Sequence, residues 1–130
     1  MSMISYGFSK TVDSPFREVL EKAKDELQKE AFGILTTIDV KEKFKEKLGI
    51  EFKEYIILGT CNPPPAFKAI ESEENIGLML PCNVIVYGRD DKTVVSVIKP
   101  TVAMQMIGNR ELTQVAENIE HKLKNAFESI

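Results

Sequence analysis

Two amphipathic segments, one near each end of the chain, constrain its fold most strongly. In residues 13–33 the apolar side chains recur at helical spacing: Phe16, Val19, Leu20, Ala23, Leu27 and Ala31. Residues 109–130 carry a second such stripe: Leu112, Val115, Ala116, Ile119, Leu123, Ala126 and Phe127. Each segment predicts a helix with a single apolar face. Each helix therefore needs a sheet or another helix against which to bury that face.

The rest of the chain is rich in stretches typical of β-strands. We predict strands over residues 2–12, 34–40, 51–60, 77–88 and 93–99, with a hairpin turn between the last two. Two short helices are expected between strands, over residues 40–49 and 62–74. Asp39 and Glu42 have the spacing of a capping box at the start of the first, and Asn62 suits the N-cap of the second.

This order of elements predicts the class of fold. We expect a single α+β domain over residues 1–130, with a mostly antiparallel sheet of about five strands backed by two main helices. The connection over residues 100–108 is apolar without clear periodicity, and we interpret it as a segment that covers the core. The alternative is a segment that contacts another subunit or covers a ligand, because it holds two methionines.

Composition narrows the classes of partner and the cellular location. The chain is mildly acidic, with a net charge of −3 and a pI of about 5.3, whereas binding to nucleic acid requires clustered Lys and Arg. No apolar run approaches the roughly 18 residues of a membrane span, and the first residues do not resemble a signal peptide. We therefore expect a cytoplasmic protein with no nucleic-acid or membrane partner, whose two cysteines remain thiols.

A repeated Cys-Asn pair is the main candidate for a functional site. The chain's two cysteines, Cys61 and Cys82, are followed by Asn62 and Asn83. The first pair follows one predicted strand, and the second lies after Pro81 near the start of the next. If these strands are antiparallel neighbours, both pairs lie at one corner of the sheet.

The residues at this corner leave several interpretations open. They can be core packing, because free cysteine is often buried. They can form a small-molecule pocket, with Cys61, Asn62, Cys82 and Asn83 as ligand-binding residues and Phe67, Met79 and Tyr87 as apolar walls. They can also supply a reactive thiol or two ligands of a soft metal. We identify no catalytic residue and no complete metal-ligand set, and the cofactor is unknown. A small-molecule binding module is our leading hypothesis, and a thiol-based redox or metal-handling protein is the alternative.

The stretch from Gly59 to Tyr87 also resembles a known family. "GTCNPPPAFKAI" followed by "IGLMLPCNVIVYG" is similar to the prokaryotic family called domain of unknown function 302. The matching residues are Cys61, Asn62, Pro63, Ala66, Gly77, Leu78, Pro81, Cys82, Asn83, Val84 and Tyr87. The resemblance implies an α+β fold with a layout like that of the TATA-binding protein, in the order strand, helix, four strands, helix. It also implies a homodimer, and it implies no specific biochemical activity.

Overall fold

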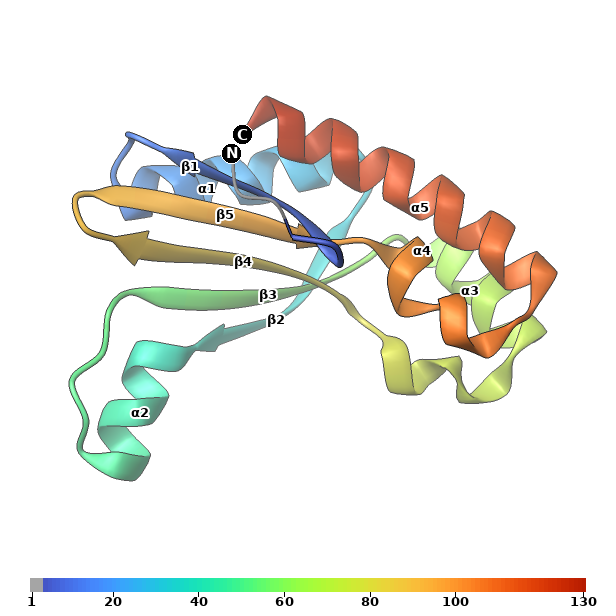
Figure 1. Ribbon diagram of the computed structural model, residues 1–130, viewed down its shortest axis with the longest axis horizontal. Coiled ribbons are helices and arrows are strands. Elements are labelled where there is room, and N and C mark those ends of the chain that lie inside the picture. The colour runs from blue at the N-terminus through green and yellow to red at the C-terminus, as the bar shows by residue number, and fades with distance from the viewer. Residues whose placement is uncertain (1–3) are drawn as a thin grey trace.

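A five-stranded antiparallel sheet forms the centre of the computed structural model, which describes residues 4–130 (Figure 1). The strands lie in the order β1-β5-β4-β3-β2, and every neighbouring pair is antiparallel. Their bounds are β1 Gly7–Val12, β2 Gly33–Asp39, β3 Tyr55–Cys61, β4 Cys82–Arg89 and β5 Lys92–Ile98. The predicted α+β class and the antiparallel sheet are therefore confirmed.

Two long helices cover one face of this sheet, as the two apolar stripes predict. Helix α1 spans Phe16–Lys29 and helix α5 spans Arg110–Ser129 (Figure 1). Their buried side chains meet those of the central strands in one core. This core includes Leu20, Ala23, Leu27, Leu58, Val84, Val86, Val95 and Leu123. In the sequence the elements follow the expected order of strand, helix, four strands and helix, with short helices inserted.

Four short helices lie together at one end of the sheet (Figure 1). Helix α3 is Pro63–Ser72, the 3₁₀ helix η1 is Glu74–Met79, helix α4 is Pro100–Ala103 and the 3₁₀ helix η2 is Gln105–Ile107. Together with the start of α5 they enclose a small second core: Ala69, Ile76, Met104, Leu112 and Ala116. The apolar connection over residues 100–108 thus covers a core, as expected.

Helix α2, Val40–Leu48, begins as the capping-box spacing predicts. The backbone N–H of Glu42 donates to Oδ1 of Asp39 at 3.0 Å. Asn62 occupies the N-cap position of α3, but its side chain does not cap the helix. Its Nδ2 instead donates to the carbonyl oxygen of Glu30 at 3.5 Å. The predicted N-cap position is therefore confirmed, but the side chain has no N–H to cap, because the second and third residues of the helix are Pro64 and Pro65.

Three predicted strands begin later than expected. The predicted strand over residues 51–60 starts at Tyr55. The predicted strand over residues 77–88 starts only at Cys82, because residues 74–79 form η1 and Ile76 is buried in the second core. Pro81 has no N–H to donate to a neighbouring strand, which suits the place where pairing begins. The predicted strand over residues 2–12 starts at Gly7, and its first two residues lie outside the described part of the chain.

Side chains alternate along β4 and separate the two faces of the sheet. Val84 and Val86 point to the face covered by α1 and α5 and are fully buried. Asn83, Ile85 and Tyr87 point to the opposite face, where they line a cavity that is described below. Within residues 4–130, no helix has the length and apolarity needed to cross a membrane.

Candidate functional site

A cavity of about 290 Å³ lies at the end of the sheet where β3 ends and β4 begins. None of the residues that line it in the described part of the chain is charged. They come from β2, β3, β4, α3, α5 and the loops beside them: Phe32, Leu35, Thr60, Cys61, Asn62, Ala66, Ile70, Leu80, Pro81, Cys82 and Ile119. We call this the cysteine cavity. It can enclose a small apolar molecule, and it offers few polar contacts.

The register of β3 and β4 brings the two cysteines to this cavity. The strands are antiparallel neighbours, and Thr60 pairs with Cys82, so Cys61 follows directly at the same end. This confirms the predicted pairing of the strands. The hydroxyl of Thr60 donates to the carbonyl oxygen of Cys82 at 2.9 Å, which joins the strands at this end. Cys82 is buried and Cys61 is half-buried.

The two asparagines of the repeated pair lie in different places. Asn62 is buried and lines the cysteine cavity. Asn83 pairs with Gly59 in the sheet, is exposed, and lines a cavity on the opposite face. The structure therefore brings Cys61, Asn62 and Cys82 together, and it separates Asn83 from them.

The walls of the cysteine cavity differ from those expected. Phe67, Met79 and Tyr87 do not line it. Its larger apolar side chains include Phe32, which precedes β2, and Leu35, at an irregularity in the pairing of β2 with β3. Of the lining residues outside the Cys-Asn pairs, the sequence analysis had named Ile119 through the apolar stripe of its helix, and Ala66 and Pro81 through the family resemblance.

Both thiols in the cavity hold their protons more tightly than an ordinary cysteine. Burial raises the pKa of Cys61. Burial and, to a lesser extent, the neighbouring Cys61 raise the pKa of Cys82 to about 11. Both side chains are therefore neutral at pH 7, whereas a nucleophilic or metal-binding cysteine reacts as the thiolate. In residues 4–130, no group of three or more His, Cys, Asp or Glu side chains is placed to hold a metal ion.

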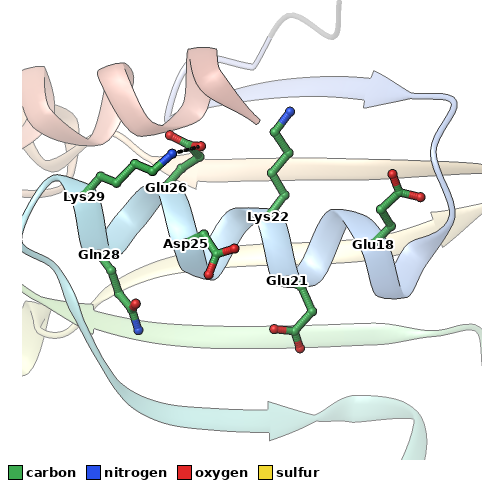
Figure 2. Close-up of a pocket in the computed structure, with 7 residues that line it drawn as sticks. All are labelled: Glu18, Glu21, Lys22, Asp25, Glu26, Gln28 and Lys29. Carbon is green, nitrogen blue, oxygen red and sulfur yellow. Dashed lines mark hydrogen bonds and ion pairs between the residues drawn. The ribbon is translucent and has the colours of Figure 1, made fainter.

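A shallow depression on helix α1 has a different character. Figure 2 shows that its lining side chains all come from this one helix and point in several directions. Lys29 and Glu26 form an exposed ion pair at 2.9 Å. These residues are the charged face of an amphipathic helix whose other face is in the core. We assign no site to this surface.

The similarities to known proteins extend over nearly the whole chain. The family model for domain of unknown function DUF302 matches residues 8–130. The crystal structure of an uncharacterized conserved protein DUF302 from Bacillus stearothermophilus is similar, with a TM-score of 0.89 and 29% sequence identity. The match covers 97% of this chain and 98% of that one. No match is found among curated proteins. The protein described here therefore belongs to the DUF302 family.

Proposed function

We propose that the protein binds a small, uncharged and largely apolar molecule in the cysteine cavity. The observation that carries this proposal is a cavity of about 290 Å³ lined by uncharged residues beside both cysteines. Ligand sites in proteins are mostly apolar, with a few placed polar groups, and begin at about this volume. A charged ligand is disfavoured because no lining side chain offsets the cost of removing its charge from water.

A few polar atoms are available to orient such a ligand. The half-buried thiol of Cys61 is a weak donor and acceptor. The Nδ2 of Asn62 makes only a long hydrogen bond of 3.5 Å. The hydroxyl of Thr60 already donates to the carbonyl of Cys82, so its remaining capacity is as an acceptor. We therefore expect the ligand to have at most one or two polar atoms where it contacts Thr60, Cys61 and Asn62.

A cavity-filling variant tests this proposal. We expect Ala66→Phe to weaken binding of the neutral fluorescent probe N-phenyl-1-naphthylamine by about tenfold or more, because the added ring occupies the cavity. Ala66 is half-buried on α3, so the longer side chain can be accommodated with little strain. Binding is measured by fluorescence titration, and folding by circular dichroism.

The control is Asn83→Ala, which changes a Cys-Asn residue on the opposite face of the sheet. It should leave the affinity for the probe within about twofold of the original. Equal binding by the folded Ala66→Phe protein and the unchanged protein would contradict the proposal, as would the absence of saturable binding to the unchanged protein.

The alternative of a thiol-based redox or metal-handling protein has less support. Both cysteines have raised pKa values, which lowers the fraction of thiolate at neutral pH. Both are free thiols, which fits a reducing compartment, and on this basis we propose a cytoplasmic location.

We also propose that the protein is a homodimer, formed by antiparallel pairing of β2 with β2 of a second copy. β2 is at one edge of the sheet, and its side chains Leu35 and Ile38 are 64% and 43% exposed. Edge strands usually carry charges, a proline or a bulge that prevents pairing. The pairing of β2 is irregular at Leu35, but in the residues after it the only charge is on the last residue, Asp39.

Light scattering after size exclusion tests the dimer. We expect twice the chain mass of 14.7 kDa for the unchanged protein and a single chain for Ile38→Lys. Leu78→Lys introduces the same charge at an exposed leucine of η1 and should remain dimeric. A single-chain mass for the unchanged protein at micromolar concentration would refute the proposal.

A further inference from the structure

A second cavity lies on the face of the sheet opposite the long helices, and no part of the proposed function uses it. Its volume is about 500 Å³. It is lined by β1, β3, β4 and β5 and by residues beside β1 and β3. The protein has three tyrosines, and all of them line this cavity: Tyr6, Tyr55 and Tyr87. We call it the tyrosine groove.

Three aromatic rings lie close together in the groove. Tyr55 and Tyr87 are directly opposite each other on β3 and β4. Their ring centres are 5.1 Å apart and their planes differ by 7°, so the two rings are stacked. The ring of Phe52 lies next to this pair, with its centre 6.4 Å from that of Tyr55 and its plane tilted by 36°. Tyr6 is exposed at the rim, and it and Tyr87 both contribute to the raised pKa of Tyr55, after burial. Planar ligands stack favourably on such rings.

The charge of the groove has one sign. Of the described residues that line it, only Lys53 and Arg89 are charged. Lys53 Nζ lies 4.7 Å from the ring centre of Tyr87, and the Arg89 guanidinium carbon lies 5.4 Å from it. Arg89 Nη2 also donates to the Tyr87 hydroxyl at 3.0 Å. Among residues 4–130, neither cation forms an ion pair with a carboxylate.

The nearby carboxylates do not line the groove. Glu54, Asp90 and Asp91 line a neighbouring depression, which Lys53 and Arg89 also border. Glu54 is paired with Lys41 at 3.4 Å. The groove therefore presents two cations and three phenolic hydroxyls, all of which can donate hydrogen bonds, above an aromatic surface.

We propose that the tyrosine groove binds a small planar aromatic anion, whose ring stacks on Tyr55 and Tyr87 and whose anionic group contacts Lys53 and Arg89. Stacking supplies the apolar contact, and the two cations select for negative charge. This proposal is independent of the cysteine cavity, which lies at the end of β3 and is lined by Cys82. The next residue, Asn83, lines the tyrosine groove on the opposite face of the sheet.

The probe for the test is 1-anilinonaphthalene-8-sulfonate, an aromatic anion whose naphthalene ring system is planar. Isothermal titration calorimetry should give one saturable site per chain in the unchanged protein. In a double variant, Lys53→Gln with Arg89→Gln, we expect the dissociation constant to rise about fivefold or more, since both charge contacts are lost. The variant Ala66→Phe should bind this probe as tightly as the unchanged protein does.

The control is Lys22→Gln, which removes one charge from the outer face of α1, on the other side of the sheet (Figure 2). It should change the dissociation constant by less than about twofold. The proposal is overturned if the unchanged protein shows no saturable binding, as it would if a second copy covered the groove. It is also overturned if the folded double variant binds as tightly as the unchanged protein, or if Lys22→Gln weakens binding as much as the double variant does.

Discussion

Replacing Phe32 by alanine is expected to lower the free energy of unfolding by about 3–5 kcal/mol. Phe32 is 1% exposed, belongs to the main core and also lines the cysteine cavity. Phe32 lies between α1 and β2 in the sequence, and its side chain lines a cavity that is already present. Loss of the ring therefore enlarges this cavity, and the cost of a truncation rises with the volume of the cavity that it leaves. Urea denaturation followed by circular dichroism measures the change.

Phe67→Ala is the matched control, because it makes the same chemical change at a phenylalanine that is 64% exposed. It should change the free energy of unfolding by no more than about 0.5 kcal/mol. Similar losses in the two variants would show that the ring of Phe32 does not pack in the core as the structure places it.

The second large effect that we expect is a loss of stability at alkaline pH. Burial raises the pKa of the Cys82 thiol from 9.0 to about 11 in the folded protein. Between these values the folded chain holds a proton that the unfolded chain has lost, so the free energy of unfolding falls as pH rises. Since one pKa unit corresponds to about 1.4 kcal/mol, the loss from this thiol is about 2–3 kcal/mol by pH 11.

The variant Cys82→Ala isolates this contribution. Other groups also titrate in this range, among them Cys61 and Tyr55, whose pKa values burial also raises. The quantity to compare is therefore the slope of unfolding free energy against pH in urea titrations between pH 8 and 11. We expect the slope of the variant to be shallower than that of the unchanged protein. Identical slopes would indicate that the thiol of Cys82 is ionised as readily in the folded chain as in the unfolded one.

The local patterns in the sequence were sufficient to predict the class of fold. The apolar stripes of α1 and α5 repeat at helical spacing, and a stripe of this kind must be buried against another layer. The capping interaction between Asp39 and Glu42 depends only on neighbouring residues and was also predictable. The corner formed by Cys61 and Cys82 followed from the antiparallel pairing of consecutive strands.

The walls of the cysteine cavity depend on tertiary structure and were not predictable. Leu35 is an extra residue at a bulge, because Ile34 pairs with Thr60 and Thr36 pairs with Gly59. No local pattern marks that position. The separation of Asn83 from Asn62 had a signal that we did not use: Asn83 directly follows Cys82 in a strand, where consecutive side chains point to opposite faces.

Because side chains alternate along β4, the face to which each one points depends on the number of residues before it in the strand. One residue added between Asn83 and Val84, with the pairing of Val84 and the residues after it unchanged, would turn the amide of Asn83 toward the apolar cysteine cavity. The side chain of the added residue would then point to the tyrosine groove in place of Asn83. A change of one residue in the length of this segment therefore alters both cavities together.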